Sequence, residues 1–158
     1  MAQVFQDNPA AAPERVADIL LVEDDVTDAQ LVLRALDRGG FAHRVEHVTD
    51  GAQALDYISS TSLFSEKTNS SMPRLILLDL NLRKLGGLHV LRQLKANDRT
   101  RSIPVIMLTS SKLAIELVES YKLGVNSYVI KPNEADRFAK VVQEISHYWL
   151  AINEPPPV

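Results

Sequence analysis

Apolar residues occur along this chain in two patterns, short uninterrupted runs and stripes with helical spacing, and the two patterns alternate. An uninterrupted apolar run is typical of a strand buried on both faces, as in a parallel sheet. The central run is Leu75-Ile76-Leu77-Leu78, which ends at Asp79. Further strands are predicted at 17–22, 43–48, 104–108 and 127–130, with 43–48 at a sheet edge because its polar residues alternate with apolar ones.

The stripes predict a helix after each strand. These helices cover 27–38, a segment from 51, the stretch 88–95, a segment from 114 and a last segment that reaches residue 152. In the fourth of them one face is predicted to point inward and consists of Ala114, Leu117, Val118 and Tyr121. Five strands alternating with five helices predict an α/β fold, a doubly wound parallel sheet with right-handed crossovers.

Polar residues between these segments predict helix caps and one long connection. Asp25 is expected to cap the first helix and Asn133 the last one. The Ser- and Thr-rich stretch 59–71 is predicted to be a surface loop.

The length of 158 residues favours a single domain, and 46% hydrophobic residues are enough for a layered core. We expect a flexible N-terminal arm at 1–15, a domain at 16–152 and a Pro-rich tail at 153–158.

Composition excludes several classes of function. The chain has no cysteine, which removes disulfides, thiol catalysis and Cys-based zinc sites. A net charge of -3 argues against general nucleic-acid binding. Without a run long enough to span a membrane and without a signal-peptide pattern, we expect a cytoplasmic protein.

Reactive side chains follow the predicted strands. Glu23-Asp24-Asp25 come after the first strand, Asp79 after the third, Thr109 after the fourth and Lys131 after the fifth. Carboxyl ends of parallel strands meet at one edge of the sheet, where open α/β proteins bind their ligands. Crowded carboxylates repel one another unless a cation joins them, and oxygen ligands suit Mg²⁺. With a lysine and a hydroxyl nearby, this set predicts a site for a phosphoryl group on Asp79.

Each of these residues has a structural explanation when it is considered alone. Acids favour the first turn of a helix because of the helix dipole, an acid that ends a strand is commonly a turn residue, and Lys131 could be a solvated side chain. Their occurrence together at one sheet edge favours chemistry. For Asp25, the helix cap is the better interpretation.

At this point the chain resembles a known family, the receiver domains of two-component response regulators. The matching segments are Leu-Val-Glu23-Asp24-Asp25, Leu-Leu-Asp79-Leu-Asn81-Leu, Val-Ile-Met-Leu-Thr109-Ser110 and Tyr128-Val-Ile-Lys131-Pro132, in the order of the family. The resemblance implies the flavodoxin-like (βα)5 fold with strand order 2-1-3-4-5.

The resemblance also implies a role for each matching residue. Asp79 would be the phosphoacceptor. Mg²⁺ or Mn²⁺ would be held by Asp79 and Asp24 directly, by Glu23 through water and by the backbone carbonyl of Asn81.

Thr109 and Lys131 would contact the phosphoryl oxygens. Tyr128 matches the aromatic residue whose rotamer is coupled to Thr109 and switches on phosphorylation, although packing alone would also explain it. The Lys131-Pro132 peptide bond would be expected to be cis.

A finer resemblance is to the single-domain response regulators of bacterial phytochrome histidine kinases. It rests on the segment 74–81 with the long stretch before it, on Val-Asn126-Ser-Tyr, and on Tyr148-Trp149 before a Pro-rich end. It implies a phytochrome-type sensor histidine kinase as the partner, and a homodimer through the fourth helix, fifth strand and fifth helix. The candidate interface residues are Leu113, Ile115, Tyr148, Trp149 and Ile152.

The chain departs from the family after the phosphoacceptor strand, where receivers usually have a proline and then an acid before glycine. Here Arg83 and Leu85 precede Gly86. Without the proline that fixes φ, the sequence does not decide how rigid this loop is, and Arg83 could add positive charge near the site.

The expected function is that of a response regulator that takes a phosphoryl group on Asp79 and signals through protein contacts. It would not be an enzyme beyond its own phosphotransfer and autodephosphorylation. One alternative is a pseudo-receiver that binds or dimerises without phosphate, favoured only by Arg83 and Leu85. An aspartyl-phosphate phosphatase is disfavoured because such enzymes have a second Asp where this chain has Asn81.

Overall fold

The computed structural model describes residues 17–41, 44–68 and 72–156. For residues 62–68 it describes the backbone alone. The predicted arm at 1–15 lies outside the described residues. The strands are β1 (Ile19–Val22), β2 (Val45–Val48), β3 (Leu75–Leu78), β4 (Val105–Thr109) and β5 (Ser127–Ile130). They form one sheet in the order β2-β1-β3-β4-β5 with every neighbouring pair parallel, so the predicted fold class and strand order are confirmed.

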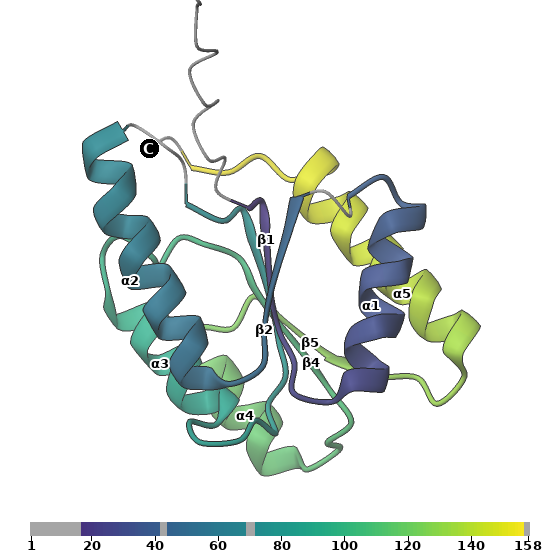
Figure 1. The fold of residues 1–158 in the computed structure, drawn as a ribbon. Helices are drawn as coiled ribbons and strands as arrows, with labels where there is room; N and C mark the ends of the chain where they lie inside the picture. The colour runs from purple at the N-terminus through teal and green to yellow at the C-terminus, as the bar shows by residue number, and fades with distance from the viewer. Residues whose placement is uncertain (1–16, 42–43, 69–71, 157–158) are drawn as a thin grey trace, which may run out of the picture.

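The helices between the strands cover both faces of this sheet. They are α1 (Val26–Arg38), α2 (Gly51–Thr68), α3 (Gly87–Ala96), α4 (Ala114–Lys122) and α5 (Ala135–His147). A π-helical segment, η2 (Tyr148–Ile152), continues α5. Helices α1 and α5 lie on one face, and α2, α3 and α4 lie on the other (Figure 1).

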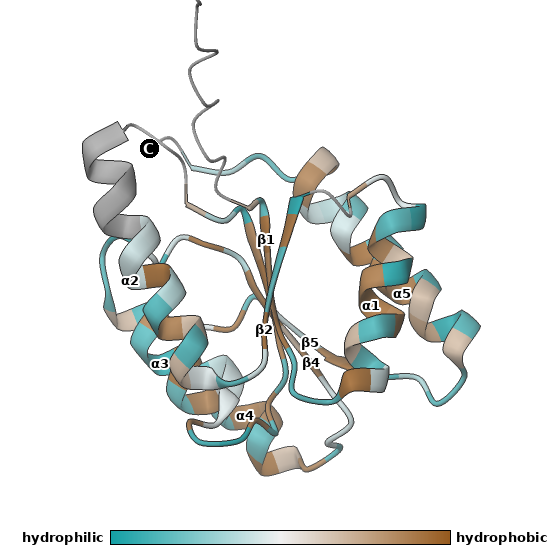
Figure 2. Cartoon of the chain, in the orientation of Figure 1, coloured by the Kyte–Doolittle hydropathy of each residue, from teal (hydrophilic) through white to brown (hydrophobic). Residues whose placement is uncertain are grey.

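The central strands are apolar throughout because each side chain has a helix layer to pack against. In β3, Leu75 and Leu77 join the core with α1 and α5, whereas Ile76 and Leu78 join the core with α2 and α3. Figure 2 shows the central strands as mostly apolar, polar segments on β2, and helices that carry both apolar and polar residues. On the edge strand β2, Glu46 is exposed, which agrees with the predicted edge position.

Two predictions about element ends and one about a peptide bond are wrong. The expected loop at 59–71 is helical through Thr68, because 52–68 contains neither Gly nor Pro and propensity is a weak prior for Ser and Thr; residues 69–71 lie outside the description. The last helix is capped at Glu134 rather than at Asn133, without a side-chain hydrogen bond. Among the described residues no peptide bond is cis, so the expectation for Lys131-Pro132 is wrong as well.

The predicted inner face of α4 is also wrong, since Leu117, Val118 and Tyr121 are exposed. Ser120 is the buried residue of this helix. The Ser120 carbonyl accepts a hydrogen bond from the Val125 N–H at 3.0 Å, and its hydroxyl donates to the Glu116 carbonyl at 2.7 Å. The helix therefore has Ser120 on its inner side and its large apolar residues on its outer side.

Close packing of the backbone at Gly87 predicts a specific sensitivity. A Cβ at Gly87 would lie 2.3 Å from the Asp79 carbonyl oxygen, whereas one at Gly86 would meet only the Leu80 carbonyl oxygen, at 3.9 Å. We expect Gly87→Ala to lower the free energy of unfolding by about 2 kcal/mol, as overpacking does, and Gly86→Ala by less than about 1 kcal/mol. Urea unfolding checks both, and equal effects of the two substitutions would contradict the close approach.

Candidate functional site

The strand ends bring the predicted reactive side chains together at the carboxyl edge of the sheet. Asp79 follows β3, and its N–H donates to the Val22 carbonyl of β1 at 3.0 Å. Lys131 follows β5, and its N–H donates to the Thr109 carbonyl of β4 at 2.8 Å. Parallel pairing thus continues past the last strand residues and fixes the backbone from which these side chains project.

The ammonium group of Lys131 lies among three carboxylates. Its Nζ is 2.6 Å from Glu23 Oε2, 2.8 Å from Asp28 Oδ2 and 3.1 Å from Asp79 Oδ2. Lys131, Glu23 and Asp79 are buried. These contacts join the ends of β1, β3 and β5 and the first turn of α1 at one point.

Asp28 is a member of this site that the sequence analysis missed. It lies in the first turn of α1, where an acid is also explained by the helix dipole. The sequence has no signal that separates Asp28 from any other acid in a first helical turn. Asp25, by contrast, caps α1 as predicted, since its Oδ1 accepts the Asp28 N–H at 2.8 Å.

The carboxylates form a donor set that suits a divalent cation. Ligand oxygens of Glu23, Asp24 and Asp79 lie within 4.8 Å of one another. Glu23 and Asp79 are buried, and Asp24 is half-buried, so a cation from solvent could reach these ligands through Asp24. All donors are oxygens, which is the ligand type that Mg²⁺ and Mn²⁺ accept. The residues therefore fit the expected metal.

Charge within the acid cluster, defined as Glu23, Asp24, Asp28 and Asp79, is incompletely balanced by Lys131. Burial raises the pKa of Glu23 to about 7, and the charge of Asp79 adds to the increase although the hydrogen bond from Lys131 opposes it. Burial acts to lower the pKa of Lys131, but its hydrogen bonds to Asp28 and Glu23 outweigh burial and hold that pKa above its ordinary value. Lys131 is therefore a fixed positive charge among excess negative charge.

Two further contacts border the acid cluster. The Asn81 N–H donates to Asp79 Oδ1 at 3.1 Å, so this oxygen and the one that faces Lys131 both have partners. Arg83 Nε lies 3.6 Å from Asp24 Oδ2, which places the predicted additional positive charge beside the site.

The predicted switch residues lie on the neighbouring strands β4 and β5, where Tyr128 is paired with Met107 and Thr109 with Ile130. Thr109 is fully buried, and its hydroxyl oxygen accepts the Ser111 N–H at 3.2 Å. The Tyr128 hydroxyl donates to the Ser111 carbonyl at 3.1 Å, and the residue is partly buried. Burial raises the pKa of Tyr128, so the phenol stays protonated at neutral pH. Ser111 thus links Thr109 to Tyr128.

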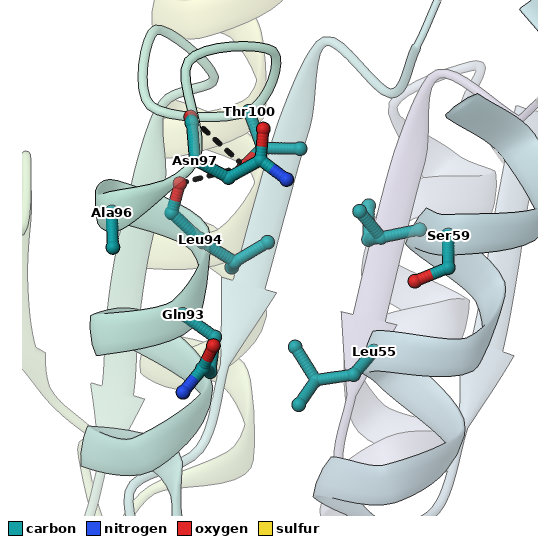
Figure 3. A pocket seen from close by; sticks show the side chains of 8 residues that line it. Leu55, Ser59, Gln93, Leu94, Ala96, Asn97 and Thr100 are labelled. Atoms are coloured by element: carbon teal, nitrogen blue, oxygen red, sulfur yellow. Dashed lines mark hydrogen bonds between the residues drawn. The ribbon is translucent and has the colours of Figure 1, made fainter. Parts of the chain in front are cut away.

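A separate open groove of about 460 Å³ lies between α2 and α3. Figure 3 shows Leu55 and Ser59 of α2 facing Gln93 and Leu94 of α3, with Asn97 and Thr100 at one end. Its lining residues include no titratable side chain, so the groove offers no acid or base and no group to activate the hydroxyls of Ser59 and Thr100. The chemistry of the described residues is therefore concentrated at the acid cluster.

Comparison with known proteins agrees with this site. Residues 19–143 match the response regulator receiver domain family. The chain belongs to that family. As a receiver domain it is a component of two-component signalling, and receiver domains bind Mg²⁺ at an acidic pocket. No helix in the described part of the receiver is long and apolar enough to cross a membrane.

The receiver is similar to proteins from different signalling contexts. It is 44% identical over 138 residues to the probable methanogenesis regulatory protein FilR2 of Methanothrix harundinacea, covering 87% of this chain and 86% of the relative. A crystal structure of the phosphorylated cyanobacterial phytochrome response regulator RcpA has a TM-score of 0.79 and 35% identity, covering 90% of this chain and 99% of the other. The bacteriophytochrome response regulator RtBRR has a TM-score of 0.67 and 46% identity, covering 90% and 85%. The receiver is therefore related to phytochrome response regulators.

Repulsion within the acid cluster leads to a prediction for Asp79→Asn. The substitution removes one of the crowded charges, while the amide oxygen can still accept a hydrogen bond from Lys131. We expect the free energy of unfolding in chelator to rise by roughly 1 to 2 kcal/mol, because a buried carboxylate that repels its neighbours is replaced by a neutral group. Urea unfolding measures the change.

The matched control is Asp98→Asn, which removes an exposed carboxylate paired with Arg101. Its effect should stay within about 0.5 kcal/mol. If Asp79→Asn were less stable than the wild type, the buried carboxylate would be a net stabilising group and this account of the charges would be wrong.

Proposed function

We propose that this receiver accepts a phosphoryl group on Asp79 from the phosphohistidine of a sensor histidine kinase. The observation that carries the proposal is the buried Asp79 carboxylate, 3.1 Å from the ammonium of Lys131 within a set of oxygen ligands. The carboxylate oxygen would form a bond to phosphorus while the bond between phosphorus and the histidine nitrogen breaks. Later hydrolysis by water would restore the carboxylate and release phosphate.

The neighbouring residues have complementary roles in this proposal. Asp24 and Asp79 would hold Mg²⁺ or Mn²⁺ directly, Glu23 through water and Asn81 through its backbone carbonyl; the bound ion would supply positive charge to the phosphoryl oxygens. Lys131 would pair with a phosphoryl oxygen in place of a carboxylate. The Thr109 hydroxyl would exchange its contact with the Ser111 N–H for a contact with the phosphoryl group. The protein would be a phosphoacceptor with autodephosphorylation rather than an enzyme that acts on other substrates.

The proposed kinase is of the phytochrome type. Support comes from similarity to RcpA and RtBRR, which are phytochrome response regulators. FilR2, a probable methanogenesis regulatory protein, is similar at a comparable level of identity and does not support this choice of kinase. We propose that the protein works in the cytoplasm through protein contacts, as a domain at 16–152 between an arm at 1–15 and a tail at 153–158, without binding nucleic acid or membranes.

An apolar surface on α4 and β5 supports a second copy of the chain as one partner. We call it the α4 face. Its large exposed side chains are Leu113, Ile115, Leu117, Val118, Tyr121 and Ile130, and Tyr148 and Ile152 of η2 are exposed as well. Trp149 is partly buried against the core and meets the Tyr148 ring edge-on, with ring centroids 5.1 Å apart. Exposed apolar groups collected in this way are typical of an interface, so we propose a homodimer through this face.

The switch residues offer a route from Asp79 to the α4 face. Movement of Thr109 toward a phosphoryl group would break its contact with Ser111, whose carbonyl holds the Tyr128 hydroxyl. Tyr128 would then repack beside α4 and shift the population of conformations that this face presents.

The direct test is the intact mass of the protein after incubation with acetyl phosphate and Mg²⁺. We expect one added phosphoryl group in the wild type and none in Asp79→Asn or in chelator. Uptake by Asp79→Asn would contradict the site assignment. No uptake by the wild type, with a donor that phosphorylates another receiver, would favour a pseudo-receiver that works without phosphate.

The proposed dimer predicts different effects for two equally exposed residues. Ile115 on the α4 face and Val26 at the start of α1 each have 70% of their surface exposed. We expect Ile115→Ser to weaken self-association about fivefold or more through lost apolar contact, and Val26→Ser to leave it unchanged. Sedimentation analysis of both forms measures the dissociation constant. Equal behaviour of the two variants would place the interface elsewhere or show that the protein is monomeric.

A further inference from the structure

Two positively charged side chains pair with different carboxylates of the acid cluster. Lys131 contacts Glu23, Asp28 and Asp79. The ion pair of Asp24 is made by Arg83, whose Nε lies 3.6 Å from Asp24 Oδ2. Asp24 is also the most exposed of the three possible metal ligands. Arg83 therefore faces the carboxylate that an incoming cation would meet first.

The loop that carries Arg83 is anchored on the start of α2. Lys84 has a φ of 61°, a left-handed conformation that side chains disfavour. Its Nζ lies 3.1 Å from Oδ2 of the buried Asp50. Next to it, a Cβ at Gly51 would lie only 2.2 Å from the Leu85 carbonyl oxygen, so the two backbones are in close contact. These contacts replace the rigidity that a proline would give and keep Arg83 beside Asp24.

The side chain of Arg83 nevertheless remains free to leave Asp24. It is 85% exposed, and the pair with Asp24 is longer than a hydrogen bond. Exposed ion pairs of this kind change an equilibrium by up to about fivefold. A divalent cation can therefore displace Arg83, but it must overcome this pairing and the repulsion of the guanidinium charge.

We propose that Arg83 is an intramolecular counter-ion of Asp24 that competes with the divalent cation and lowers the affinity of the site for it. The inference rests on the proposed function, because it takes Asp24 as a metal ligand. Arg83 acts through Asp24 and is a positioning residue rather than a catalytic one. Its effect is to raise the concentration of metal at which the receiver becomes competent for phosphorylation.

The test is Mn²⁺ binding to the full chain, followed through the electron paramagnetic resonance signal of free Mn²⁺ at low ionic strength. We expect Arg83→Gln to bind Mn²⁺ about two- to fivefold more tightly than the wild type. Arg83→Lys keeps the charge and should lie between them. The difference should shrink at about 0.5 M salt, because ions screen exposed charges.

Arg101→Gln is the matched control, since it removes an exposed arginine that pairs with Asp98 at the opposite edge of the sheet. It should bind Mn²⁺ as the wild type does. Equal or weaker binding by Arg83→Gln overturns the proposal. Phosphoryl uptake on Asp79 with unchanged affinity in Arg83→Gln would overturn this inference alone, whereas loss of Mn²⁺ binding in every form would overturn the metal site of the proposed function as well.

Discussion

The site depends on the ion pairs between the Lys131 ammonium and the surrounding carboxylates. The ammonium neutralises part of a set of carboxylates contributed by β1, α1 and β3, which would otherwise repel one another at a buried sheet edge. Removing one partner of a buried ion pair typically costs about 3 to 5 kcal/mol, because the remaining charge stays buried without compensation. Lys131 therefore contributes both to stability and to the proposed chemistry, since the group that pairs with these carboxylates is also the one that a phosphoryl oxygen would contact.

Much of the fold could be predicted because the physical cause lies within short stretches of sequence. A strand such as Leu75–Leu78 is apolar at every position since helices cover both of its sides. Once the sheet is parallel, the residues after the strands must lie at one edge, so Glu23, Asp79 and Lys131 could be brought together without knowing any side-chain geometry. The close contacts among them follow from topology.

The parts that could not be predicted depend on tertiary contacts. Asp28 has the same appearance in sequence as any acid in a first helical turn, and only the position of Lys131 gives it a role. The orientation of α4 runs against its apolar stripe, because Ser120 is buried while Leu117 and Tyr121 are exposed. Arg83 could be named as a charge near the site, but its pairing with Asp24 depends on the anchoring of Lys84 on Asp50.

The outward-facing α4 has a consequence for local stability. Because Ser120 is its buried residue, the helix contributes little apolar surface to the core, and its carboxyl end is held mainly by backbone hydrogen bonds. Segments with few buried contacts open with a small fraction of the global unfolding free energy. The amide hydrogens of α4 should therefore exchange with solvent long before those of β3, in a region where a modest electrostatic change is enough to redistribute the ensemble.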